Sequence, residues 1–243
     1  MNKTSIAATN TWYQQPLGTA LLKAELSGLT SVLPQIFGYY IVQIGGPNYS
    51  ELLAASPIHN HILVNQEPAS SDVYQIKCQL EELPFLPESI DVVVLFHLLE
   101  FSPQPMTILQ EIYTALIPNG YVIIFGFNPY SLWSLTSNKD APWSGSWLSP
   151  KHIRQYLAKI GFTIGDYKTF YFRPPSNNTE KFLALEGLGQ IFWPYNGASY
   201  MFVAQKTISG LTPIKPLASL QKHANSSKAL PKPTARQSCN SDR

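Results

Sequence analysis

The sequence predicts an α/β fold built on a mostly parallel sheet, and two apolar runs with a helix between them carry this prediction. Residues 92–96 (VVVLF) are continuously apolar, which is typical of a strand covered on both faces. From Pro105 to Leu116 apolar residues recur at helical spacing. A second apolar run, rich in β-branched residues, follows at residues 121–127. Strand, helix and strand in this order predict a right-handed βαβ unit in an open sheet.

Five elements are predicted before this unit. A helix is expected from Pro16 to Leu33, because its leucines fall near one stripe and proline suits a first helical turn. Strands are expected at residues 39–44 and 62–64, with a short helix at residues 50–55 between them. Residues 73–78 form a third, weaker strand candidate.

The later elements have clear boundary signals. Residues 118–120 (PNG) predict the end of the central helix, because proline cannot continue it and Asn or Gly tolerates a left-handed turn. Ser149 is a predicted N-cap, followed by proline in the first turn of a helix that stops at Gly161. Strands are expected at residues 163–172 and 199–206, with an insertion between them.

Charge and composition divide the chain. We expect a flexible N-terminus at residues 1–11, one domain at residues 12–206 and a disordered basic tail at residues 207–243, which holds many Pro, Ser, Lys and Ala. Residues 206–243 contain seven Lys or Arg and one Asp, whereas the rest of the chain has ten basic and fourteen acidic residues. This balance excludes a basic nucleic-acid-binding surface on the domain.

Membrane and metal functions have little support in the sequence. No apolar run is long enough to span a bilayer, and the N-terminus lacks a signal-peptide pattern. Cys78 and Cys239 are far apart, so neither a disulfide framework nor a cysteine metal site is expected. His59, His61 and His152 do not form a zinc signature, and we predict no metal site. A cytoplasmic location is the default expectation.

Several motifs resemble one family. The motifs LPF (residues 83–85), SIDVVV (89–94) and ILQEIYTALIPNG (108–120) are similar to the later half of a class I S-adenosylmethionine (SAM)-dependent methyltransferase domain. The motifs LLEFSPQP, GFNPYSLW and FRPP resemble a methyltransferase type 11-like bacterial branch of that superfamily. The resemblance covers residues 12–205. It implies a Rossmann-like, doubly wound, mostly parallel seven-stranded sheet with an antiparallel last strand, and SAM as the cofactor.

The resemblance also implies where the cofactor lies. In open α/β sheets, ligands bind outside the carboxyl ends of the strands, where the strand order reverses. The family has an acidic residue at the position of Gln43 and a glycine at that of Gly45, with Gly46 here as an offset second glycine. Glycine allows the backbone to approach the cofactor without a Cβ in the way.

The other cofactor positions follow from the same alignment of motifs. Asn65 stands where the family has an acid that accepts hydrogen bonds from the ribose hydroxyls, and Gln79 with Leu80 stands at the adenine position. Phe96 and His97, at the end of the fourth strand, are expected to face the crevice. Three amides therefore occupy positions where acids are usual.

The catalytic residue is left open by the sequence, with His97 and Asn128 as candidates. His97 has the unperturbed pKa of a general base, ~6.5, but also suits a structural role. Asn128 follows the fifth strand and is expected at the crevice. Because aligning the acceptor with the methyl group supplies much of the rate, acceptor positioning is expected to dominate over base catalysis. Aromatic residues after the fifth strand and at Trp193 and Tyr195 would either bind a flat substrate or pack the connection onto the sheet.

The predicted function is SAM-dependent methyl transfer to an unidentified acceptor, a small molecule or otherwise. The alternative is a degenerate methyltransferase fold that acts as a non-catalytic binding or regulatory protein. A nicotinamide dehydrogenase would need G-x-G-x-x-G after the first strand and an α/β-hydrolase G-x-S-x-G, and the chain has neither. The oligomeric state is left open.

Overall fold

The computed structural model describes residues 11–47, 50–65, 74–135, 146–175, 187 and 191–207. The chain divides into two units, Met1–Ile208 and Ser209–Arg243, and the second lies wholly outside the described residues. The predicted disordered tail therefore lies outside them except for residue 207, and the predicted flexible N-terminus except for residue 11.

The described residues of the first unit build a seven-stranded sheet in the order β3-β2-β1-β4-β5-β7-β6. The first five strands pair in parallel, and β7 runs antiparallel to both β5 and β6. The predicted mostly parallel sheet with an antiparallel last strand is confirmed. The strands are β1 (Tyr40–Gly45), β2 (Asn60–Asn65), β3 (Tyr74–Lys77), β4 (Ile90–Phe96), β5 (Leu116–Phe127), β6 (Phe162–Phe170) and β7 (Ser199–Lys206).

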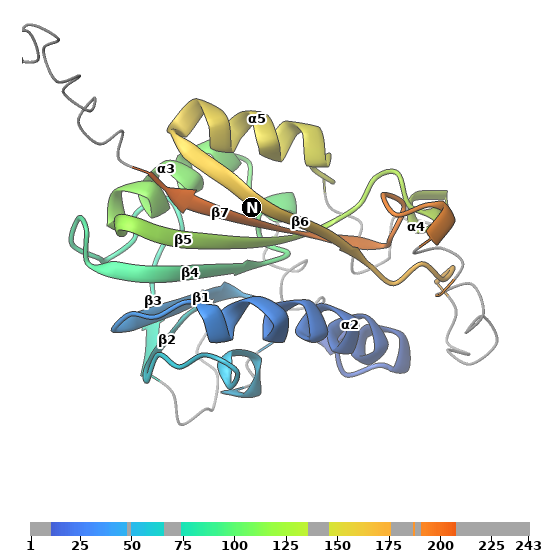
Figure 1. Ribbon diagram of the computed structural model, residues 1–243, viewed down its shortest axis with the longest axis horizontal. Helices are drawn as coiled ribbons and strands as arrows, with labels where there is room; N and C mark the ends of the chain where they lie inside the picture. The colour runs from blue at the N-terminus through green and yellow to red at the C-terminus, as the bar shows by residue number, and fades with distance from the viewer. Residues whose placement is uncertain are drawn as a thin grey trace, which may run out of the picture. The chain divides into compact units, whose positions relative to one another are not determined.

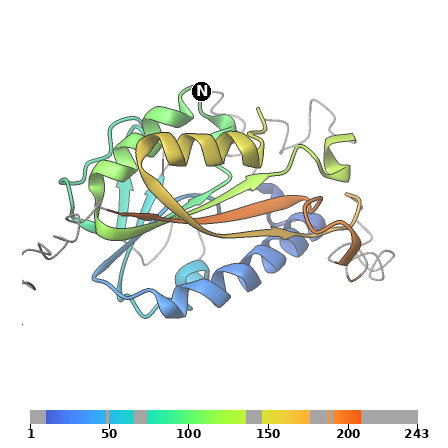
Figure 2. The ribbon, with the colours of Figure 1, turned by 45° about the horizontal axis from the view of Figure 1, so that its top comes forward.

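Helices cover the two faces of the sheet unequally. Helix α2 (Pro16–Val32) lies on one face, and α3 (Pro105–Ala115) and α5 (Pro150–Ile160) lie on the other, as Figures 1 and 2 both show. Shorter elements are the 3₁₀ turns η1 (Leu33–Gln35), η2 (Ser50–Leu53) and η3 (Leu99–Phe101) and the one-turn helix α4 (Leu132–Leu135). None of the described helices has the length and apolar character that a membrane span requires.

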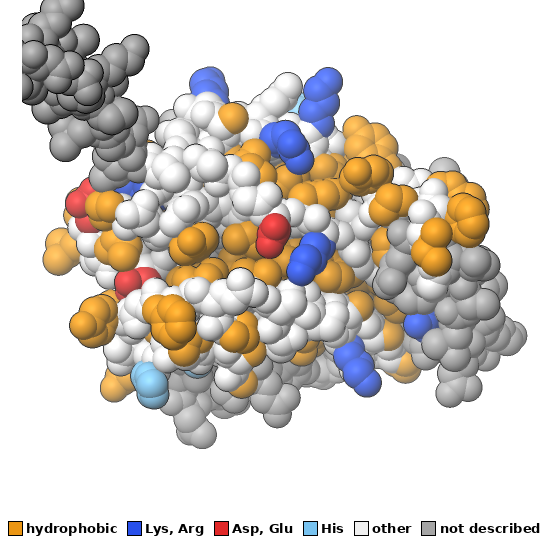
Figure 3. Space-filling model, viewed as in Figure 1, with side chains coloured by type: hydrophobic (Ala, Val, Ile, Leu, Met, Phe, Trp, Pro, Cys, Tyr) orange, Lys and Arg blue, Asp and Glu red, His pale blue; other side chains and the backbone are white. Residues whose placement is uncertain are grey.

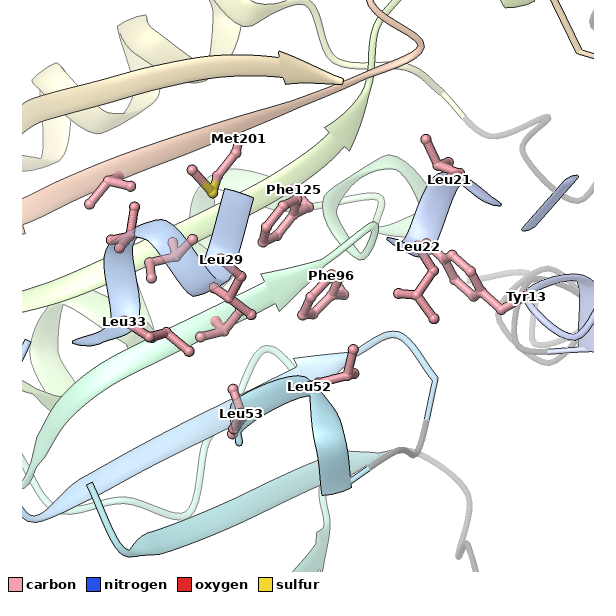
Figure 4. Packing of buried hydrophobic residues seen from close by; sticks show 14 of the residues in the cluster. Tyr13, Leu21, Leu22, Leu29, Leu33, Leu52, Leu53, Phe96, Phe125 and Met201 are labelled. Atoms are coloured by element: carbon pink, nitrogen blue, oxygen red, sulfur yellow. The ribbon is translucent and has the colours of Figure 1, made fainter. Parts of the chain in front are cut away.

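Strand β4 shows why its sequence is continuously apolar. Val92, Val94 and Phe96 pack in the core on the α2 face, and Val93 and Leu95 pack in the core on the α3 and α5 face. Successive side chains point to opposite faces of a strand, so both sets must be apolar. In Figure 4 the Phe96 ring lies beside the Phe125 ring of β5, and the two are stacked at 4.5 Å between centroids.

The boundary signals of α5 act as expected. The side chain of Ser149 accepts a hydrogen bond from the backbone N–H of His152 at 3.3 Å. Gly161 ends the helix in a left-handed conformation with a φ of 114°. The sequence predictions of this helix's start and stop are confirmed, because both depend on local backbone chemistry.

Two predicted elements differ in detail. The short helix expected at residues 50–55 is a 3₁₀ turn, Ser50–Leu53. The central helix ends at Ala115, and β5 begins at once with Leu116 paired to Ile90. The predicted stop at residues 118–120 is instead an irregularity within β5, where Asn119 has a φ of 64°. Lys206 holds this start of the strand by donating from Nζ to the Leu116 carbonyl at 2.7 Å.

Candidate functional site

The strand order places a ligand crevice between β1 and β4. From β1 the chain builds outward to β2 and β3, and from β4 it builds outward in the opposite direction, so the winding reverses between these two neighbours. Ligands of such sheets bind outside the carboxyl ends of the strands at that reversal. Here those ends are Gly45 and Phe96, which are paired with each other.

The two glycines after β1 have a conformation and a position that only glycine suits. Gly45 and Gly46 both have a φ of 75°, in the left-handed region. A Cβ on Gly45 would lie 2.8 Å from the carbonyl oxygen of Phe96, and one on Gly46 would lie 2.6 Å from the Phe96 Cβ. The glycines therefore let the loop pass directly against the end of β4. The side chain of a valine at Gly45 would clash with the end of β4, and it would also clash with any ligand that lies over the loop.

Gln43 is buried and ties this loop together. Its Nε2 donates to the carbonyl oxygens of Gly45 at 3.1 Å and Pro47 at 3.0 Å. A carboxylate has no proton to donate, so an acid at this position could not make these two bonds. The amide that replaces the family's acid thus has a structural use in this loop.

We expect Gln43→Glu, which restores the family's acid, to lower the free energy of unfolding by about 2 to 4 kcal/mol, because the carboxylate would face two carbonyl oxygens. Urea unfolding at pH 7 measures the change. Gln75→Glu on the half-buried strand β3 is the matched control. Equal stability of wild type and Gln43→Glu would contradict the role of the amide.

The remaining predicted cofactor residues are dispersed. Asn65 ends β2, and its side chain lies outside the described part of the chain. Gln79 is exposed after β3, whereas Leu80 is buried in the core on the α3 and α5 face. Phe96 was expected to face the crevice, but strand alternation turns its ring into the core on the α2 face, where it covers Gly46.

His97 lies at the centre of a buried polar cluster. It follows β4 with a φ of 42°, and its Nε2 lies 2.8 Å from Oε1 of Glu25 on α2. Its Nδ1 lies 3.4 Å from Oε1 of Glu100, an ion-pair distance without hydrogen-bond geometry. The same Glu100 oxygen accepts a hydrogen bond from the backbone N–H of Phe127 at 2.7 Å. The cluster therefore links α2, β4, η3 and β5 at the carboxyl edge of the sheet.

The carboxylates determine the charge of His97. Burial alone would lower its pKa, but Glu25 and Glu100 outweigh burial and raise the pKa to about 9. The ring is therefore an imidazolium at neutral pH, with each nitrogen beside a carboxylate. An imidazolium cannot accept a proton, so this pKa counts against His97 as a general base.

We expect stability to fall as the pH rises from 6.5 to 9. The pKa of His97 is about 9 in the fold against 6.5 as its ordinary value, so its stabilisation is complete below pH 6.5 and is lost as the pH rises through 9. The difference corresponds to roughly 3 kcal/mol. Urea unfolding at several pH values measures this loss. The same measurement on His97→Gln is the reference, because subtracting its pH dependence removes the contribution of the other titrating groups. Parallel curves for the two proteins would contradict the raised pKa.

Asn128 is buried and fully used by the chain itself. Its Nδ2 donates to the carbonyl oxygens of Tyr195 at 2.7 Å and Gly197 at 2.9 Å, and its Oδ1 accepts from the N–H of Tyr130 at 3.1 Å. The side chain thus holds the loop before β7 against the end of β5. All three of these bonds are made within the chain, and a contact of Asn128 with a ligand stays a prediction.

The sequence matches the family model of a methyltransferase domain over residues 46–124, from the second loop glycine into β5. The sheet order agrees with this match. The chain has the Rossmann-like fold of class I methyltransferases.

Individual known proteins are also similar to this chain, in sequence or in fold. An uncharacterised Escherichia coli protein, YafS, is 24% identical over 213 residues, which cover 86% of this chain and 85% of that protein. A Thermotoga maritima SAM-dependent methyltransferase, described as a possible histamine N-methyltransferase, has a TM-score of 0.58 at 19% identity, over 81% of this chain and 94% of its own. An Archaeoglobus fulgidus SAM-dependent methyltransferase has a TM-score of 0.57 at 19% identity, over 75% of this chain and 93% of its own. These structural likenesses concern the fold.

The sequence did not identify three residues of the buried cluster: Tyr13, Glu25 and Glu100. Glu25 offered a signal, because it lies three residues after Leu22 and four before Leu29 on the apolar stripe of α2. An acid on such a stripe is buried against the sheet and needs a partner. Which partner it has was not readable, since His97 is 72 residues away.

A hollow of about 320 Å³ lies far from this site, at the amino ends of the parallel strands. Tyr121 of β5, Asp166 of β6 and Gln205 of β7 line it together with the end of α2. Figure 3 shows hydrophobic side chains gathered in the band between α2 and β6. Ligands of open α/β sheets bind at the opposite edge, so the hollow lies away from the expected ligand position.

Proposed function

We propose that the domain transfers a methyl group from SAM to an acceptor held at the carboxyl edge of the sheet, beside the His97 cluster. The observation that carries the proposal is the left-handed glycine pair at the reversal between β1 and β4. The family match begins within this pair, at Gly46. The buried Glu25, His97 and Glu100 lie on the other side of the same strand end.

The residues present fit the cofactor at the glycine loop and depart from the family elsewhere. By the resemblance, Gly45 and Gly46 would hold the methionine part, Asn65 the ribose, and Gln79 with Leu80 the adenine. SAM would supply a methyl group made electrophilic by the sulfonium. The amide of Gln43 is already used within the loop, so it is not free to replace the family's carboxylate.

Catalysis on this proposal relies on alignment of the acceptor. His97 is fixed between two carboxylates, and Asn128 is bonded to backbone, so neither side chain is placed to remove a proton. Phe127 and Trp147 are stacked at 5.7 Å beside the cluster, where they would keep water out. Alignment and exclusion of water are together sufficient for methyl transfer to a nucleophile that is already neutral.

The proposal is tested by transfer of labelled methyl from SAM to fractions of a cell extract. Gln79→Ala should raise the KM for SAM by roughly two- to tenfold, the worth of one hydrogen bond. Gln35→Ala, an equally exposed glutamine at the opposite edge, is the matched control and should leave KM unchanged. If neither transfer nor SAM binding is detected with wild type, the proposal is wrong.

The second candidate is a non-catalytic binding or regulatory protein. The observation in its favour is that Phe96 and Leu98 pack on the glycine loop, beside which the cofactor would lie. The amides of Gln43, Asn65 and Gln79, which stand where the family has acids, also favour this candidate. SAM binding without transfer to any fraction, or no SAM binding in a folded protein, would favour this candidate.

A further inference from the structure

We infer that Glu25, His97, Glu100 and the hydroxyl of Tyr13 form a binding site for an organic ammonium group. The inference rests on the proposed function for its consequence, which is that the methyl acceptor is anchored by an ammonium group and receives the methyl group on another, neutral atom. Three features of the cluster support the site: its charge, its polar atoms without partners and the aromatic rings around it.

The cluster combines two acidic side chains with a single histidine. With both glutamates ionised and His97 protonated, the cluster lacks one positive charge. Burying an uncompensated carboxylate is strongly unfavourable, so this imbalance requires a reason. A bound cation would remove it.

Polar atoms of the cluster also lack hydrogen-bond partners among the described residues. They are Tyr13 Oη, Glu25 Oε2, Glu100 Oε2 and His97 Nδ1, each on a side chain that is at most 3% exposed. The first three are oxygen atoms that can accept, and the ring of Tyr13 lies 6.3 Å from that of His97 between centroids. Three buried oxygen atoms of this kind would stabilise the positive charge of an organic ammonium group.

Aromatic rings border this polar cluster. His97 lies 4.0 Å from Phe127 and 6.3 Å from Tyr13, measured between ring centroids. Trp12 lies 5.2 Å from Tyr13 and 6.0 Å from Trp133. Aromatic faces attract cations, and carboxylates repel anions, so the combination selects an organic cation. No group of three metal-binding side chains is placed to hold a metal ion within the described residues, which favours an ammonium over a metal.

The turn that precedes α2 brings Tyr13 to the cluster. Trp12 and Tyr13 are buried there against Gly18, where any Cβ would overlap the Trp12 carbonyl. The Tyr13 carbonyl accepts from the Thr19 hydroxyl at 2.9 Å, and both rings pack in the core on the α2 face. The turn therefore fixes the Tyr13 ring beside His97.

Calorimetry with choline and 3,3-dimethyl-1-butanol tests the inference on the full chain. The two probes have the same shape, but only choline carries a charge. We expect choline to bind wild type at least tenfold more tightly than the neutral probe. Tyr13→Phe, which keeps the ring, should weaken choline binding several-fold, and Glu25→Gln at least tenfold. Glu88→Gln, which changes a half-exposed glutamate at the opposite edge, is the matched control.

Equal binding of the two probes, or no choline binding at millimolar concentration, would overturn the ammonium site. So would choline binding that is unchanged in both Tyr13→Phe and Glu25→Gln. SAM is titrated separately into the same protein. SAM binding without choline binding rejects this inference and leaves the proposed function standing, whereas choline binding without SAM binding supports the site and counts against methyl transfer.

Discussion

His97→Gln is expected to lower the free energy of unfolding by about 3 to 5 kcal/mol at pH 7, because it leaves Glu25 and Glu100 buried without a cation. Denaturant unfolding followed by circular dichroism measures the loss. His59→Gln is the matched control, since His59 is exposed and its replacement should change stability by less than about 0.5 kcal/mol.

The double variant Glu25→Gln/His97→Gln separates charge from packing. It removes one of the two carboxylates that lose their partner, so it should recover part of the stability that His97→Gln alone loses. A His97→Gln protein as stable as the His59→Gln control would show that the cluster is not a charge-compensated network.

Asn128→Ala is expected to lower the free energy of unfolding by about 2 to 4 kcal/mol, because the carbonyls of Tyr195 and Gly197 lose their donor in a buried position. Thermal and denaturant unfolding measure this loss. Asn60→Ala is the control, since that side chain is exposed and makes one bond, to the Tyr39 carbonyl at 2.8 Å. SAM affinity should be little changed in Asn128→Ala. A fully stable variant with weakened SAM binding would return Asn128 to the ligand site.

The sequence was sufficient wherever structure depends on neighbouring residues. The continuous run in β4, the Ser149 cap and the Gly161 stop are local signals, and the structure confirms each of them. The sheet order is the one that the fold prediction implies, and it reverses between β1 and β4. Gly45 and Gly46 need glycine for a reason that the sequence did not show, because the atoms that their missing Cβ would meet belong to Phe96 and Leu98.

The candidate site could not be read to the same depth. Glu25 and Asn128 each bond across more than sixty positions, and no local pattern reports such a partner. Strand alternation turns the ring of Phe96 toward the α2 face, where it packs in the core, and a contact with the cofactor stays a prediction. From the sequence, Gln43 is only an amide where the family has an acid. In the structure its Nε2 donates two hydrogen bonds that close the loop, and the sequence does not show that the carbonyls of Gly45 and Pro47 accept them.

Hydrogen–deuterium exchange of the full chain with and without SAM tests the central claim most directly, because it reports both binding and its location without any substitution. We expect SAM to slow amide exchange in the loop around Gly45 and Gly46 and in the segment around His97 and Leu98. Exchange around the opposite hollow, at Asp166 and Gln205, should be unchanged. No change at saturating SAM, or protection only at the hollow, would contradict the placement of the cofactor between β1 and β4.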